Sequence, residues 1–155
     1  MLQSKPTYNT DYGYARVAAA VPALNVADIE GNVQSIKASI NEAIEQKAQL
    51  IVFPEMSITG YTCADLFGNE TLLNEAEKAL DTIASSIGNS NAIVIVGAPI
   101  RYNGHLYNCA VVMQKGNCGL VPRRKGPTSR DWNRMGCFTL ANLRGAPFGG
   151  VWMTG

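Results

Sequence analysis

The sequence predicts an α/β domain with a mostly parallel sheet. Short apolar runs without polar alternation occur at residues 50–53 and 92–96, and two longer stretches repeat their apolar residues at intervals of three and four. The first pattern is typical of strands buried in a layered domain, and the second is typical of amphipathic helices. Because the two patterns alternate along the chain, they favour a layered α/β fold.

The first predicted strand and the first predicted helix follow a polar start. Residues 16–22 form a small apolar run that ends in proline, which fits a buried strand. The period then changes over residues 28–47, which predicts an amphipathic helix. The residues of its apolar face are Val33, Ile36, Ile40, Ala43 and Ile44.

The central predicted strand, residues 50–53, is apolar throughout and is expected to be buried on both faces. Pro54 ends it, because proline has no N–H to donate to a neighbouring strand. Glu55 is therefore left at the carboxyl end of the strand, where α/β folds place their chemistry. A carboxylate at such a position suits a general base, and the alternative role is a helix cap or a salt bridge.

Three further elements complete the predicted order. A second helix covers residues 70–87 and is closed by a Gly-Asn pair. The strand at residues 92–96 is predicted to end at the Gly-Ala-Pro that follows it. Residues 105–114 come after an Asn-Gly turn and are predicted to be the returning strand of a hairpin.

The stretch FPEMSITGYTCADLF, residues 53–67, resembles the first catalytic motif of the nitrilase, or carbon–nitrogen hydrolase, superfamily. It is most similar to the amidase domain at the N-terminus of bacterial glutamine-dependent NAD synthetases, and the resemblance extends over about residues 12–122. It implies an incomplete nitrilase-type α-β-β-α sandwich, with glutamine as the family substrate.

The family uses a Glu-Lys-Cys triad, in which a thiolate attacks the amide carbon and the cation stabilises the oxyanion. The resemblance assigns the general base to Glu55. Arg123 stands at the position of the family lysine in the segment VPRRKGP, and arginine supplies charge with a different reach and no proton transfer. A segment like GVEICEDLW, which carries the nucleophilic cysteine in the family, is absent from the sequence, and Cys137 is a poor substitute because no strand end surrounds it.

The resemblance also suggests residues on the substrate side of the site. Tyr61 follows a predicted tight turn and brings an amphipathic aromatic ring beside Glu55. Ser129 stands where the family has a tyrosine, and Trp132 stands where it has a phenylalanine.

The four cysteines show no CxxC spacing. Cys63 and Cys109 are interpreted as small buried hydrophobic residues. Cys118 falls in the predicted turn GNCG and is expected to be exposed. No signal peptide is recognised at the start of the sequence, so a reducing cytoplasm is expected.

Charge divides the chain into two parts. Residues 1–122 carry seven positive and eleven negative side chains, whereas residues 123–155 carry six positive and one negative. We therefore predict a flexible polar arm over residues 1–11, a hydrolase-like domain over residues 12–122, and a divergent basic tail rich in Gly and Arg over residues 123–155.

Several classes of partner are not expected. The near-zero net charge argues against a nucleic-acid binder, and no apolar run approaches the length of a membrane span. His105 has no cluster of ligands at metal-binding spacing, and no phosphate-binding loop is present.

The resemblance implies the N-terminal part of a glutamine-hydrolysing domain that supplies ammonia to a separate synthetase domain. The synthetase domain, with its ATP and deamido-NAD, is expected to be missing from this chain, so the chain carries no cofactor and is expected to be inactive alone. One alternative is a non-catalytic nitrilase-like scaffold that assembles with a partner or as a homo-oligomer. Another is a small-amide hydrolase that uses Cys137.

Overall fold

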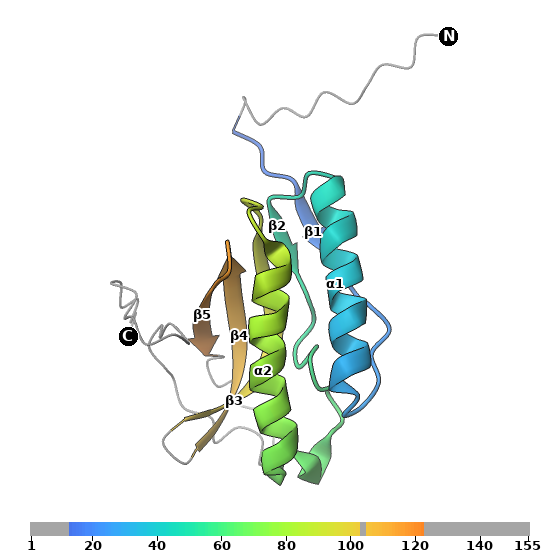
Figure 1. The fold of residues 1–155 in the computed structure, drawn as a ribbon, viewed down its shortest axis with the longest axis vertical. Helices are drawn as coiled ribbons and strands as arrows, with labels where there is room; N and C mark the ends of the chain where they lie inside the picture. The colour runs from blue at the N-terminus through green and yellow to red at the C-terminus, as the bar shows by residue number, and fades with distance from the viewer. Residues whose placement is uncertain (1–12, 103–104, 123–155) are drawn as a thin grey trace.

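The structure is a computed structural model that describes residues 13–102 and 105–122. In these residues the chain forms one five-stranded sheet with two helices on one of its faces (Figure 1). The strands lie in the sheet in the order of the sequence. The elements are β1 (Val17–Ala19), α1 (Ile29–Glu45), β2 (Leu50–Val52), the 3-10 helix η2 (Ala64–Gly68), α2 (Glu70–Ile87), β3 (Ile93–Tyr102), β4 (His105–Gln114) and β5 (Asn117–Pro122).

The sheet is mixed. β1, β2 and β3 run parallel, and α1 and α2 lie in the two connections between them. β3, β4 and β5 are antiparallel, and each is the sheet neighbour of the strand before it in the sequence. The α/β prediction is confirmed, and parallel pairing is confined to the first three strands because β4 and β5 return directly without a crossover helix.

Both helices begin at a side-chain cap. The Asp28 carboxylate accepts a hydrogen bond from the Gly31 N–H at 3.0 Å, and the Asn69 side-chain oxygen accepts from two N–H groups in the first turn of α2. A cap of this kind stabilises a helix by about 1 kcal/mol. The helices predicted at residues 28–47 and 70–87 are both present. Neither described helix is long and apolar enough to cross a membrane.

The helices bury one face of the sheet. Side chains alternate between the two faces along a strand, so every second strand residue meets the apolar stripes of α1 and α2. Burying one such side chain fully contributes about 1.5–3 kcal/mol. The strand residues that are fully buried on this face are Ile51, Val94, Val96, Ala98, Val111 and Met113.

The first two strands are less buried than the sequence suggests. Val17 of β1 is 63% exposed and Val52 of β2 is 38% exposed. The prediction of a buried first strand is therefore wrong for Val17, and the prediction of burial on both faces is wrong for β2. The reason is that α1 and α2 lie on the same side of the sheet (Figure 1). An apolar run predicts that a strand is buried, but it does not show whether the described residues provide an element that packs on each face of the sheet.

β3 continues past the point where it was predicted to end. Pro99 lies inside the strand and pairs with Asn108 of β4. The N–H of Gly97 points towards the β2 side of β3 and donates a hydrogen bond to the Ser57 hydroxyl. Backbone groups two residues apart in a strand point to the same side, so the nitrogen of Pro99 also points towards the β2 side. Since β2 ends at Val52, a proline at position 99 removes no ladder hydrogen bond.

β5 was not predicted, and it changes the environment of Cys118. This residue pairs with Met113 of β4 and is buried, so the prediction of an exposed turn cysteine is wrong. The turn between β4 and β5 lies before Cys118, at Lys115 and Gly116, which have φ values of 49° and 74°. Two consecutive positive φ values are typical of the tight turn that joins two hairpin strands.

Candidate active site

Glu55 lies just beyond the carboxyl end of β2. The chain leaves the sheet after Phe53, whose N–H donates to the carbonyl oxygen of Ile95 at 2.9 Å. Met56 then adopts a φ of 53°, a left-handed conformation that is uncommon for a residue with a side chain. Glu55 itself is half-buried. Backbone outliers of this kind cluster at functional sites, so the conformation makes this loop a candidate site.

The backbone around Glu55 lies directly against Gly97 of β3. A Cβ atom at position 97 would stand 2.4 Å from Met56 N, 2.6 Å from the Pro54 carbonyl oxygen and 2.7 Å from Glu55 Cα. The buried hydroxyl of Ser57 accepts a hydrogen bond from the Gly97 N–H at 3.2 Å. The loop can occupy this position only because glycine leaves room for a second backbone.

Asn32 of α1 holds the loop from the helix side. Its buried side chain donates to the carbonyl oxygens of Asn25, at 2.8 Å, and Ile58, at 3.0 Å, and accepts from the Asn25 N–H at 2.8 Å. The helical period of residues 28–47 predicts the apolar face of this helix, but it does not distinguish Asn32 from the other polar residues. The residues that follow Glu55 are thus fixed to both β3 and α1.

Asn108 of β4 contacts the Glu55 carboxylate, and it was not among the predicted site residues. Its side-chain N–H donates a hydrogen bond to Glu55 Oε1. Asn108 is half-buried and lies on the sheet face opposite the buried side chains of Tyr107 and Cys109. The alternation of the strand could have shown that Asn108 faces away from the core, although nothing local connects it with Glu55.

β5 ends beside this contact. Pro122 pairs with Cys109, the neighbour of Asn108 in β4. The predicted site residues Arg123, Ser129 and Trp132 and the alternative nucleophile Cys137 lie outside the described residues. Their roles stay predictions.

Tyr61 follows the turn that the sequence predicts. Gly60 has a φ of 81°, which glycine adopts readily, and Tyr61 behind it is 65% exposed. The ring is therefore accessible on the chain segment that continues from Glu55, and its role towards a substrate stays a prediction.

The described cysteines are unsuited to nucleophilic attack. Cys63, Cys109 and Cys118 are buried, which confirms the prediction for the first two. The Cys63 thiol donates to the Thr59 carbonyl oxygen at 3.0 Å. Burial raises the pKa of the Cys109 thiol to about 11, so this residue is protonated at neutral pH. A nucleophilic cysteine needs the thiolate and access to substrate.

The raised pKa of Cys109 predicts a specific loss of stability in alkali. The pKa rises from 9.0 to about 11 on folding, so the folded chain holds the proton more tightly than the unfolded chain. We therefore expect the free energy of unfolding to fall as the pH rises from 9 towards 11, and to fall less steeply in Cys109→Val. Urea unfolding at several pH values would measure this. Equal slopes for the two proteins would contradict it.

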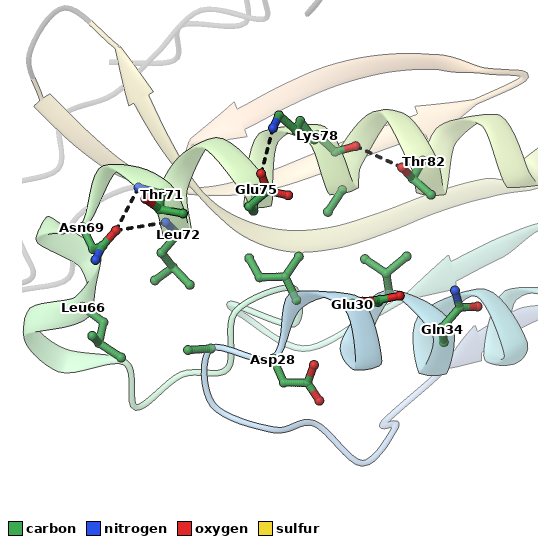
Figure 2. A pocket seen from close by; sticks show the side chains of 14 residues that line it. Asp28, Glu30, Gln34, Leu66, Asn69, Thr71, Leu72, Glu75, Lys78 and Thr82 are labelled. Atoms are coloured by element: carbon green, nitrogen blue, oxygen red, sulfur yellow. Dashed lines mark hydrogen bonds and ion pairs between the residues drawn. The ribbon is translucent and has the colours of Figure 1, made fainter.

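A separate groove of about 690 Å³ lies between α1 and α2 (Figure 2). Four of its polar side chains have partners: Asp28 and Asn69 cap the helices, and Lys78 pairs with Glu75 at 2.7 Å. Glu55 does not line it, so it is distinct from the loop site. Within residues 13–102 and 105–122, no group of three His, Cys, Asp or Glu side chains is arranged to hold a metal ion.

Known protein families include one that matches most of the described residues. The family model described as carbon-nitrogen hydrolase matches residues 16–125. The chain belongs to the carbon–nitrogen hydrolase family. The match includes the five strands, both helices and the Glu55 loop, and it confirms the family that the motif at residues 53–67 resembles.

The individual relatives that the chain resembles include glutamine-dependent NAD(+) synthetases. The chain is 32% identical over 122 residues to a glutamine-dependent NAD(+) synthetase of Mycobacterium tuberculosis. The aligned part covers 78% of this chain and 18% of the relative. It is 42% identical over 91 residues to the synthetase of Aquifex aeolicus, which covers 59% of this chain and 16% of that protein. The chain thus spans less than a fifth of the length of these relatives.

Solved structures agree with the sequence comparison. The glutamine-dependent NAD(+) synthetase of Cytophaga hutchinsonii superposes with a TM-score of 0.68 at 30% identity, over 72% of this chain and 19% of the synthetase. A nitrilase-superfamily amidase of Nesterenkonia superposes with a TM-score of 0.63 at 19% identity, over 81% of this chain and 50% of the amidase. The described helix layer and sheet therefore correspond to part of a nitrilase-type fold.

Proposed function

We propose that this chain is the N-terminal part of a glutamine-hydrolysing domain that supplies ammonia, and that Glu55 is its general base. One observation carries the proposal: the Glu55 carboxylate accepts a hydrogen bond from Asn108 of β4. The loop that carries Glu55 is itself hydrogen-bonded to β3 and to α1. A general base must be held within reach of the proton that it removes. An acceptor oriented by a neighbouring amide and carried on a fixed loop meets that requirement.

Arg123 is proposed as the cation of the site, because it stands at the position of the family lysine in the segment VPRRKGP. A fixed positive charge near the reacting carbonyl stabilises the oxyanion formed when an amide is attacked.

The nucleophile is proposed to come from outside the described residues. Amide hydrolysis at this site needs a thiolate or an equivalent group near Glu55. Cys63, Cys109 and Cys118 are buried, and the pKa of Cys109 is raised to about 11. We infer that the 155-residue chain holds the base of the site and is inactive by itself. ATP and deamido-NAD would be bound by a separate synthetase domain.

Ammonia release from glutamine tests this proposal in two proteins. The first is the 155-residue chain, which we expect to release no more ammonia than its Glu55→Gln variant. The second is a chimera in which residues 16–125 replace the matching segment of the Mycobacterium tuberculosis relative, and we expect it to hydrolyse glutamine.

Two results would contradict the proposal. Activity of the chain alone that disappears in Cys137→Ser would show a small-amide hydrolase with a relocated cysteine. A folded but inactive chimera would show a non-catalytic scaffold.

Arg123 can be tested in the same chimera against its neighbour Arg124. The resemblance places Arg123, and not Arg124, at the position of the family cation. We expect Arg123→Ala to lower the rate of glutamine hydrolysis by about 100-fold, as the loss of an oxyanion-stabilising group does in other enzymes, and Arg124→Ala to leave it nearly unchanged. Equal effects of the two substitutions would remove Arg123 from the site.

A further inference from the structure

The loop that carries Glu55 crosses β3 on its way to β4. Side chains alternate between the two faces of a strand, and the residues on either side of Gly97 are buried beneath the helices. A Cβ atom at Gly97 would therefore project to the other face, where it would meet the backbone of residues 54–56. Asn108 lies on that same face of the neighbouring strand and pairs with Pro99. The crossing at Gly97 thus brings the Glu55 side chain to Asn108.

Asn108 is carried by a strand inside the sheet. β4 spans ten residues and lies between β3 and β5. Leu106, two residues earlier on the same face of β4, packs against a small apolar cluster that consists of Met56, Cys63 and Phe67. Side chains on strands are placed more reproducibly than side chains on loops. The position of Asn108 relative to the Glu55 loop is therefore fixed by β4 itself.

The contact between the two side chains has a defined direction. The Asn108 side-chain N–H donates to Glu55 Oε1. An ionised carboxylate only accepts hydrogen bonds, so the amide has to turn its nitrogen, and not its oxygen, towards Glu55. A hydrogen bond to a charged group is about twice as strong as one between neutral groups. Asn108 therefore fixes the orientation of a charged carboxylate.

Other contacts hold the loop and not the carboxylate. Before Glu55, the Phe53 N–H donates to the Ile95 carbonyl oxygen, and after it the Ser57 hydroxyl bonds to the Gly97 backbone. A glutamate side chain has several rotatable bonds beyond its backbone, so a fixed loop leaves the carboxylate free to adopt other rotamers. The hydrogen bond from Asn108 restricts these rotamers directly.

We propose that Asn108 is a positioning residue, whose amide holds the Glu55 carboxylate in the orientation from which it takes up the proton of the nucleophile. Because Asn108 acts through Glu55, this role rests on the function proposed above for that carboxylate. It makes the base dependent on a donor from β4, in addition to the loop on which the base is carried. A purely structural contact would stabilise the fold and leave turnover unchanged.

Kinetics of the chimera that carries residues 16–125 test this role. We expect Asn108→Ala to lower kcat for glutamine by about 10- to 100-fold and to change KM by less than about threefold, because the base is misplaced while substrate binding is retained. Asn108→Asp has nearly the same shape and should lower kcat at least as much, because it replaces the donor with a second carboxylate. The matched control is Asn74→Asp at an exposed position of α2, which should leave kcat nearly unchanged.

Thermal unfolding of the 155-residue chain tests the contact independently of activity. Asn108→Asp should lower the Tm by about 4–8 °C, because two acceptors then face each other. In the double variant Glu55→Gln/Asn108→Asp the donor and the acceptor exchange places, since the glutamine amide can donate to the carboxylate at position 108. We expect the double variant to recover most of the lost Tm. Asn74→Asp should leave the Tm nearly unchanged.

The outcomes separate this role from the function proposed for Glu55. If Glu55→Gln loses activity but Asn108→Ala keeps the kcat of the parent chimera, Asn108 is not a positioning residue and Glu55 is still the base. An inactive chimera, or a fully active Glu55→Gln chimera, would overturn the function of Glu55 and this role with it. A double variant that melts as early as Asn108→Asp would show that the amide does not donate to the carboxylate, which would also overturn the role of Asn108.

Discussion

Glu55→Gln should abolish glutamine hydrolysis in the chimera that carries residues 16–125, lowering the rate by about 100- to 10,000-fold. Glutamine has the shape of glutamate and keeps a side-chain oxygen that can accept the hydrogen bond from Asn108. It cannot take up the proton of an attacking nucleophile. The loss would therefore report proton transfer, because the fold and the contact to Asn108 are retained.

Glu70→Gln provides the matched control for this result. Glu70 begins α2 and pairs with Arg101 at 3.1 Å, and its side chain is 80% exposed. Its substitution removes the same charge from the same chain and should change the rate by less than about threefold, since exposed ion pairs contribute about 0–1 kcal/mol. If both variants keep the activity of the parent chimera, Glu55 is not the base, and its contact with Asn108 has a structural role.

Local patterns in the sequence account for most of the fold. The helix period at residues 28–47 and 70–87 and the proline that stops the central strand are signals carried by neighbouring residues, and the structure confirms them. The position of Glu55 beyond β2 follows from the same local signal. A family resemblance at residues 53–67 then gives this carboxylate a chemical meaning that periodicity does not supply.

The partners of Glu55 could not be predicted in the same way, because they are distant in sequence. Asn108 is 53 residues away from Glu55, and Ser57 and Gly97 are 40 residues apart. No local pattern in the sequence distinguishes Asn108 or Gly97, and only the sheet register brings them next to the Glu55 loop. Burial of the central strand was overestimated for a related reason, because an apolar run does not say which layers cover it.

Gly97→Ala should displace the Glu55 loop and destabilise the domain by about 1–3 kcal/mol. The added Cβ would stand 2.4 Å from Met56 N and 2.7 Å from Glu55 Cα. Both atoms belong to backbone, so no side-chain rotation relieves the contact, and the loop must shift away from β3. The hydrogen bond between Ser57 and the Gly97 N–H would lengthen as a result.

Gly68→Ala separates this steric effect from the general cost of replacing a glycine. Gly68 ends η2, and a Cβ at that position has no atom within 4 Å. Urea unfolding should therefore show a loss for Gly97→Ala and a change within about 0.5 kcal/mol for Gly68→Ala. In the chimera, Gly97→Ala should also lose most of the glutamine hydrolysis, because a misplacement of about 1 Å at a catalytic group can cost about 100-fold in rate. Full activity with unchanged stability would mean that the close packing of the Glu55 loop against Gly97 is not required.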